Sequence, residues 1–189
     1  MEYVMLRRFL INIIFFVCLV YPGQAQDTKT PHPDVTVRTR AANSKTRLDI
    51  RIKGGKRYVI LAKRDSNVLS SDDAQRVKVV GYIKDTAVIL QDTYRSKPNG
   101  TYYCQAGEEQ FLRIISVKGA RPVETLRLKT NSCYDSVELD MEEGDEGIEW
   151  IPESSTMRVH LIGVGVPGRS EPGRLRTIRI DSEGRPIEQ

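Results

Sequence analysis

Residues 46–64 read TRLDIRIKGGKRYVILAKR, and this stretch decides the fold class. From Leu48 to Ile52 apolar residues alternate with charged ones, a period of two that is typical of a strand with one buried face. The pair Gly54-Gly55 interrupts the alternation, and a second strand-like arm follows it. Two such arms around two glycines predict a β-hairpin.

The second arm of this hairpin is apolar on both faces near its middle. Val59 and Leu61 occupy one face, and Tyr58 and Ile60 occupy the other. A strand with two apolar faces is expected to lie between two layers, whereas a strand with one apolar face borders solvent. We therefore expect the second arm to be the more buried of the two.

The rest of the chain continues the strand pattern. RVKVVGYI (76–83) and TAVILQDTY (86–94) predict a second hairpin, and further strand-like segments follow as far as RTIRID (176–181). No amphipathic run exceeds about two helical turns. The predicted fold is all-β, a single antiparallel sandwich or small barrel of about nine or ten short strands held by one disulfide.

The first 25 residues are predicted to be a secretory signal. A mostly apolar run from Phe9 to Val20 follows two arginines, and the small residues Gly23 and Ala25 suit signal peptidase. The run is shorter than the roughly 20 residues of a spanning helix, so we expect cleavage, with a retained anchor as the alternative. The expected location is the periplasm or the exterior, without stable membrane insertion.

Three further segments are expected after the signal. Residues 26–45 are polar and contain two prolines, which predicts a mobile lead-in that can pair as an edge strand. Residues 46–182 form the predicted β-domain, and residues 183–189 form a C-terminal tail.

Cleavage would remove Cys18 and leave Cys104 and Cys133 in an oxidising compartment, where such a pair predicts a disulfide. Their spacing is not that of a redox motif. Beside Cys104, Glu108 and Glu109 are adjacent, and adjacent side chains on a strand point to opposite faces. We therefore predict a solvated turn at these glutamates, not a catalytic pair.

Catalytic and metal-binding motifs are not evident in the sequence. The two histidines are His32, in a proline-flanked segment, and His160, which we expect beside Arg158 on the more polar face of a strand. No Gly-x-Ser-x-Gly motif is present, and the acidic run 135–149 lacks the order of an EF-hand loop. We predict no enzyme activity, no cofactor and no metal, and we interpret 135–149 as a solvated acidic loop.

Charge is distributed unevenly along the chain. The net charge of +4 is too small to predict nucleic-acid binding. Basic side chains gather in 51–64 and 169–185, and acidic ones gather in 135–149, a separation that can steer a charged protein partner. The residues expected to contact a partner are two tyrosine anchors and three basic side chains: Tyr102, Tyr103, Arg51, Lys53 and Arg57.

These features predict an exported, non-enzymatic envelope protein that binds another protein, such as a periplasmic inhibitor or an immunity-type protein. The tyrosines directly before Cys104 resemble a feature of periplasmic lysozyme inhibitors over this short stretch. Their Ser-Gly-x-x-Tyr loop is absent, and no family is assigned. One alternative is a structural component that pairs an edge strand with its partner. The other is a glycan hydrolase using Glu108, Glu149 or His160.

Overall fold

The computed structural model describes residues 32, 34–42, 45–68, 73–98, 107–132, 134–135, 137–140, 147–163 and 171–189. Antiparallel strands dominate these ranges, beside the short 3-10 helix η2 (Pro152–Ser154), and the all-β prediction is confirmed. None of the helical turns in the described ranges is long and apolar enough to cross a membrane.

The described residues form two sheets. The first has three strands in the order β1–β2–β3: β1 (Val35–Ala42), β2 (Lys45–Ile52) and β3 (Arg57–Lys63). The second has nine, and its path runs β12–β11–β10–β8–β7–β6–β5–β4 with β9 paired to β10. Their bounds are β4 (Arg76–Ile83), β5 (Ala87–Arg95), β6 (Glu108–Ser116), β7 (Val123–Ser132), β8 (Val137–Leu139), β9 (Ile148–Ile151), β10 (Thr156–Gly163), β11 (Glu171–Ile180) and β12 (Pro186–Glu188).

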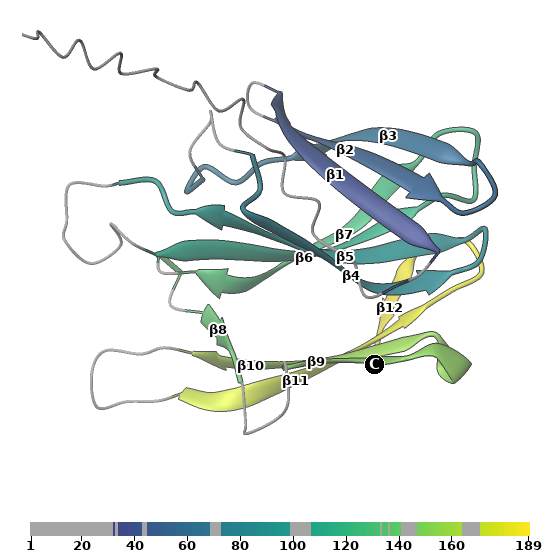
Figure 1. Cartoon of the computed structure of the whole chain (residues 1–189). Coiled ribbons are helices and arrows are strands. Elements are labelled where there is room, and N and C mark those ends of the chain that lie inside the picture. The colour runs from purple at the N-terminus through teal and green to yellow at the C-terminus, as the bar shows by residue number, and fades with distance from the viewer. Residues whose placement is uncertain are drawn as a thin grey trace, which may run out of the picture.

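Neither sheet closes into a barrel, and the strands form three layers where a single sandwich would have two. Figure 1 shows β1–β3 above, β4–β7 in the centre and β9–β11 below, with β12 between the central and lower strands. The nine-stranded sheet folds over at β8, which pairs with β7 only through Ser132 and Val137. A single residue pair imposes little coplanarity, so the two parts of this sheet can face each other.

Both faces of the central layer are buried. On β5, Val88 and Leu90 point to one side, and Ala87 and Ile89 point to the other. This explains the uninterrupted apolar run at 87–90, since a strand between two layers needs no polar face. The upper core, between β1–β3 and the central layer, contains Val35, Val37, Leu48, Ile50, Ile52, Ala62, Val77, Val79, Val88, Leu90, Ile115 and Val117. The lower core, on the other side, contains Ala87, Ile89, Leu112, Ile114, Leu139, Met157, Val159, Ile178 and Ile180.

Both predicted hairpins are confirmed. In the first, β2 pairs with β3 in a register that places Ile50 opposite Tyr58. Gly54 and Gly55 have φ values of 98° and 97°, a region that glycine enters at little cost. In the second hairpin, β4 pairs with β5.

The expectation that β3 is more buried than β2 is wrong. Val59 and Leu61 are 41% and 54% exposed, whereas Leu48 and Ile50 on β2 are fully buried. The reason is the layer order: the outer face of β1–β3 has no described layer above it, so the second apolar face of β3 borders solvent.

The predicted solvated turn at Glu108 and Glu109 is also wrong. Both residues open β6, and the Glu109 side chain is fully buried. The described strands extend past residues 46–182 at both ends, because β1 lies in the predicted lead-in and β12 lies in the predicted tail. The signal segment, Tyr102, Tyr103 and the pair Cys104 and Cys133 lie outside the described residues, so the disulfide and the tyrosine anchors stay predictions.

Candidate functional site

The outer face of the β1–β3 sheet carries a dense group of cations. We call it the basic face and define it by ten outward side chains of β1, β2 and β3. They are Arg38, Arg40, Lys45, Arg47, Asp49, Arg51, Arg57, Val59, Leu61 and Lys63. All of these side chains are exposed except Asp49, which is partly buried, and it is the only acid among seven cations.

Alternation along each strand creates this face. Val35 and Val37 on β1 are buried in the upper core, so Arg38 and Arg40 point outward. On β2, Leu48 and Ile50 point inward, which leaves the intervening charged residues to solvent. The same residues that anchor the sheet therefore fix the direction of its arginines.

The register places like charges directly opposite one another. Arg40 pairs with Arg47 across β1 and β2, and Arg51 pairs with Arg57 across β2 and β3. Cβ atoms of directly opposite residues are about 4.5–5.5 Å apart, and like charges in that position destabilise a sheet. The arrangement is therefore unfavourable for the isolated protein.

Asp49 offsets the charge at one end of the face. Its carboxylate accepts two hydrogen bonds from Arg57, with Nε at 2.9 Å, and lies 3.7 Å from Arg51 Nε. The hydrogen bonds from Arg57 hold the pKa of the Asp49 carboxyl below its usual value. Arg51 and Arg57 are thus partly neutralised within the sheet.

The other end of the face is compensated less, because Asp49 acts on Arg47 only as a nearby charge. Arg40 and Arg47 form no ion pair with any other described residue, and Lys45 and Lys63 flank them one row further along. A cavity of about 160 Å³ opens on the face between these two ends. It is lined by Arg38, Arg40, Arg47, Asp49, Arg51 and Arg57.

Two exposed apolar side chains adjoin the arginines. Val59 lies directly opposite Asp49, and Leu61 lies directly opposite Arg47. Their exposed fractions, 41% and 54%, are high for large apolar residues within a strand. The basic face therefore combines guanidinium groups with a contiguous apolar strip along β3.

A buried polar network supports the sheet beneath Arg40 and Arg47. Thr46, fully buried on β2, has its hydroxyl 3.0 Å from that of Tyr94 and accepts a hydrogen bond of 3.3 Å from Arg64 Nε. The Tyr94 hydroxyl also donates to the buried carboxylate of Asp92. Burial raises the pKa of Tyr94 far above its usual value, so it stays a neutral donor.

Arg113 joins this network to the central layer. Its Nε lies 2.9 and 2.8 Å from the Asp92 carboxylate oxygens, and its Nη1 donates to Glu124 and, at 3.2 Å, to the carbonyl of Lys63. Burial would lower the pKa of Arg113, but the facing carboxylates raise it above its usual value. The end of β3 is therefore fixed to the central layer by a charged, fully buried side chain.

The predicted partner residues fall in three places. Arg51 and Arg57 lie together on the basic face. Lys53 lies on the adjacent turn, where its Nζ is 3.6 Å from Asp34 Oδ1, and its side chain remains 78% exposed. Tyr102 and Tyr103 lie outside the described residues.

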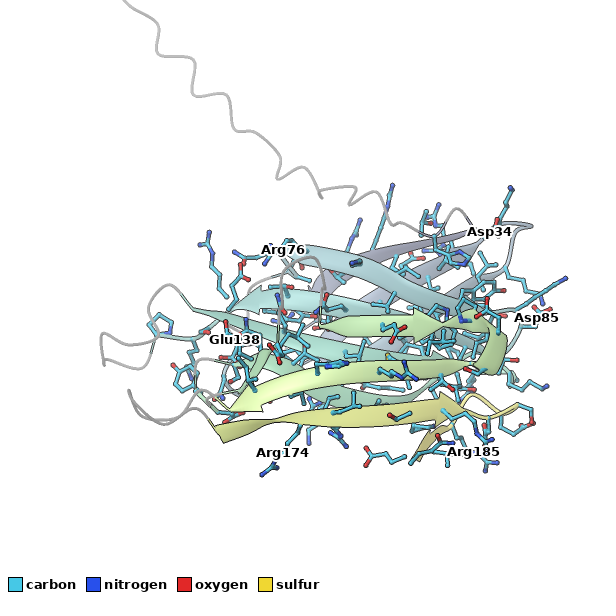
Figure 2. All side chains as sticks on the ribbon, turned by 90° about the horizontal axis from the view of Figure 1, so that it is seen from below. Asp34, Arg76, Asp85, Glu138, Arg174 and Arg185 are labelled. Carbon is cyan, nitrogen blue, oxygen red and sulfur yellow. The ribbon has the colours of Figure 1, made fainter. Side chains whose placement is uncertain are left out.

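A second, shallower depression lies on the outer face of β9–β11. Figure 2 shows the molecule from this side, with Arg174 labelled on β11 and Glu138 on β8. The depression has a volume of about 600 Å³, and its lining includes His160 and an ion pair of 3.2 Å between Arg158 and Glu149. The predicted position of His160 beside Arg158 on the polar face of its strand is confirmed.

The carboxylates of the enzymatic alternative are engaged separately. Glu108 on β6 pairs with Arg76, whereas Glu149 on β9 pairs with Arg158. Among the residues that the structure describes, no group of three or more His, Cys, Asp or Glu side chains is placed to hold a metal ion. Residues 141–146 of the acidic run are not among them.

No known relative was found. No protein-family model, no curated protein and no solved structure matches this chain. The argument for function therefore starts from the geometry of the basic face.

The sequence interpretation missed Arg38, Arg40 and Arg47 as parts of this face. The signal was present in VTVRTRAA (35–42), where Val35 and Val37 alternate with polar residues. The polar composition on both sides of this alternation favours a mobile lead-in over a strand when the sequence is considered alone. The pairing that fixes it involves β2, and Arg47 had not been connected with β1.

Proposed function

We propose that this protein is a non-enzymatic envelope protein that binds an acidic protein partner through the basic face. The observation that carries the proposal is the pair of directly opposed arginines, Arg40 and Arg47, which form no ion pair with the described residues. A sheet gains no stability from such a pair. Its presence is explained if another molecule supplies the negative charge.

The composition of the face favours a protein over a nucleic acid. Arginine is enriched at the centres of protein interfaces, where it is combined with apolar contacts such as Val59 and Leu61 would make. Single-stranded nucleic acids are held largely by stacking on aromatic side chains, and the basic face as defined contains none. The predicted secretory signal is the reason for proposing that the protein meets its partner in the envelope.

The binding surface of the partner is expected to have acidic side chains around a small apolar patch that contacts β3. Opposite charge would accelerate association and fix orientation, while burial of the β3 strip would supply part of the affinity. The support from Thr46, Arg64 and Arg113 holds this part of the sheet in one position, which lowers the entropic cost of binding.

The experiment compares two leucines of similar exposure on opposite outer layers. Leu61 on the basic face is 54% exposed and Leu175 on β11 is 57% exposed. Wild-type protein, Leu61→Asp and Leu175→Asp would be immobilised and exposed to envelope extract, and the retained partner would then be purified for measurement of Kd. We expect Leu61→Asp to weaken binding at least tenfold and Leu175→Asp to leave it unchanged. Equal binding by both variants would refute the basic face as the interface.

A second candidate function is assembly by edge-strand pairing. Among the described strands, β1 and β3 each pair only with β2. The amide of Ala41 donates to Asp73 and so points away from β2, and the amide of Thr39, two residues earlier, points the same way. Thr39→Pro would remove that donor. Loss of the complex in Thr39→Pro, together with normal binding by Leu61→Asp, would favour this candidate over the first.

A further inference from the structure

The Arg40–Arg47 end of the basic face has the geometry of a small anion site. The two residues are directly opposed across β1 and β2, so their side chains leave the sheet from neighbouring points. Both belong to the lining of the cavity of about 160 Å³. A cavity needs only about 10–15 Å³ of this kind of volume to hold one water molecule, so the space is sufficient for a small oxyanion.

The charge balance determines what kind of anion would fit. The one carboxylate of the basic face, Asp49, is occupied by hydrogen bonds from Arg57. Arg40 and Arg47 form no ion pair among the described residues, and Asp49 acts on Arg47 only as a nearby charge that Arg57 and Arg51 share. Most of their positive charge is therefore left uncompensated there. A doubly charged anion matches both, whereas a singly charged one leaves repulsion between the guanidinium groups.

The donor geometry distinguishes between shapes of anion. Each guanidinium is a planar fork that binds two oxygens with parallel N–H groups. A single carboxylate has two oxygens and satisfies one fork. A tetrahedral group such as phosphate or sulfate has enough oxygens for Arg40 and Arg47 together.

We propose that Arg40 and Arg47 form a site for a doubly charged tetrahedral oxyanion, a phosphate or sulfate group. The inference rests on the proposed function for its choice of the basic face, and it names the chemical group that one end of this face takes. The group can be a free ion or an ester carried by a larger ligand, because the side chains that line the cavity are exposed or partly exposed.

The test is calorimetric titration at constant ionic strength, with sodium phosphate, sodium sulfate and glycerol 2-phosphate as probes and sodium chloride as the reference. The variant is Arg40→Gln/Arg47→Gln. The matched control is Arg174→Gln/Arg179→Gln, which removes two exposed arginines from β11 on the opposite outer layer. Trp150 is the only tryptophan of the chain, and its fluorescence verifies that each variant is folded.

We expect saturable binding of phosphate or sulfate to the wild type and to the control, and at least tenfold weaker binding to Arg40→Gln/Arg47→Gln. Binding of glycerol 2-phosphate as tight as that of phosphate identifies an esterified group as an accepted source. Binding of the inorganic ions alone identifies a free ion. Absence of saturation in the wild type, or equal affinity in both double variants, overturns the inference.

The two proposals can fail independently. If the oxyanions do not bind but a protein partner binds in a Leu61-dependent manner, the inference fails and the proposed function holds. If phosphate binds through Arg40 and Arg47 but no partner depends on Leu61, the proposed function fails and the anion site remains.

Discussion

The two outer layers of this protein differ in how completely their arginines are paired with carboxylates. On β9–β11, Arg158 lies directly opposite Glu149 and forms an ion pair with it. On β1–β3, Arg40 lies directly opposite Arg47, and neither forms an ion pair with the described residues. Since both faces border solvent, exposure alone does not explain the difference. The difference agrees with our proposal that another molecule supplies negative charge to the basic face.

The two sides of the central layer also differ in how many charged side chains they bury. Among the described residues the buried charged side chains are Arg64, Asp92, Glu109 and Arg113, and all of them lie on the upper side of the central layer. The lower core consists of apolar residues. The β1–β3 layer is therefore attached partly by buried ions. The β9–β12 layer is attached by apolar packing and by neutral hydrogen bonds, from the Ser116 hydroxyl to the Glu183 carbonyl and from the Thr125 hydroxyl to the Gly184 carbonyl.

The largest expected effect comes from breaking the buried ion network. Arg113→Met would leave the carboxylate of Asp92 buried without its cation, and removal of one partner from a buried pair costs about 3–5 kcal/mol. Denaturant unfolding measures the loss. The control is Arg127→Met, directly opposite Arg113 on β7 but partly exposed, for which we expect a loss of about 1 kcal/mol. Equal losses would mean that the network does not anchor the upper layer.

The second-largest loss of stability is expected from a substitution that disturbs the apolar packing of the lower core. A Cβ atom on Gly81 of β4 would lie 2.7 Å from the Trp150 ring, so Gly81→Ala forces the indole to move. Overpacking of this kind costs about 1–3 kcal/mol. We expect lower unfolding free energy and altered Trp150 fluorescence. Gly119→Ala, where the nearest atom to the new Cβ is 3.8 Å away, is the control and should change stability by less than about 0.5 kcal/mol.

A pH-dependent effect tests the buried charge of Glu109. Its Oε1 accepts a hydrogen bond of 3.0 Å from Ser96, and Lys129 Nζ lies 3.7 Å from its Oε2. Burial raises the pKa of the Glu109 carboxyl above 4.5. The folded state therefore holds this proton more tightly than the unfolded state, and the stabilising contribution falls as pH rises from about 4.5 through the folded pKa.

Glu109→Gln should abolish this decline, while Glu108→Gln, which alters the neighbouring exposed pair with Arg76, should retain it. Unfolding free energies measured between about pH 4.5 and neutral pH decide between these outcomes. The range avoids the titration of Asp65, whose lowered pKa makes stability fall only at lower pH. An unchanged slope in Glu109→Gln would show that other groups cause the decline.

The smallest expected changes in the free energy of unfolding come from removing one exposed arginine on each outer face, and they have opposite signs. Arg40→Gln removes one member of a like-charge pair and should raise stability by about 0.2–1 kcal/mol. Arg158→Gln removes one member of an ion pair and should lower stability by a similar amount, up to about 1 kcal/mol. Both changes should shrink at high salt, because exposed charges are screened. A loss of stability in both variants would mean that Arg40 is held by contacts within the sheet.

Local patterns in the sequence correctly predicted the hairpins, because a hairpin is determined by residues that are close together in the chain. The alternation in 46–64 and its two glycines identified the β2–β3 hairpin, and the strand-like segments 76–83 and 86–94 identified the β4–β5 hairpin. Layer order depends on residues far apart in the chain. The outward position of Val59 and Leu61 follows from the absence of a described layer above β3, which no local pattern reveals.

The site was predicted only in part for the same reason. Arg51 and Arg57 belong to one hairpin, and their grouping could be anticipated. Arg40 joins them through the pairing of β1 with β2, a strand that the polar composition of 26–45 concealed. The burial of Glu109 likewise depends on Ser96 and Lys129, which β5 and β7 bring to it.

The most direct test measures stability and binding on the same variant, Arg40→Gln/Arg47→Gln. If these arginines are retained for a ligand, the variant should unfold with equal or higher free energy than the wild type while its affinity for the captured partner falls at least tenfold. If the variant instead loses stability, or if it binds the partner as tightly as the wild type, the basic face is not the binding surface.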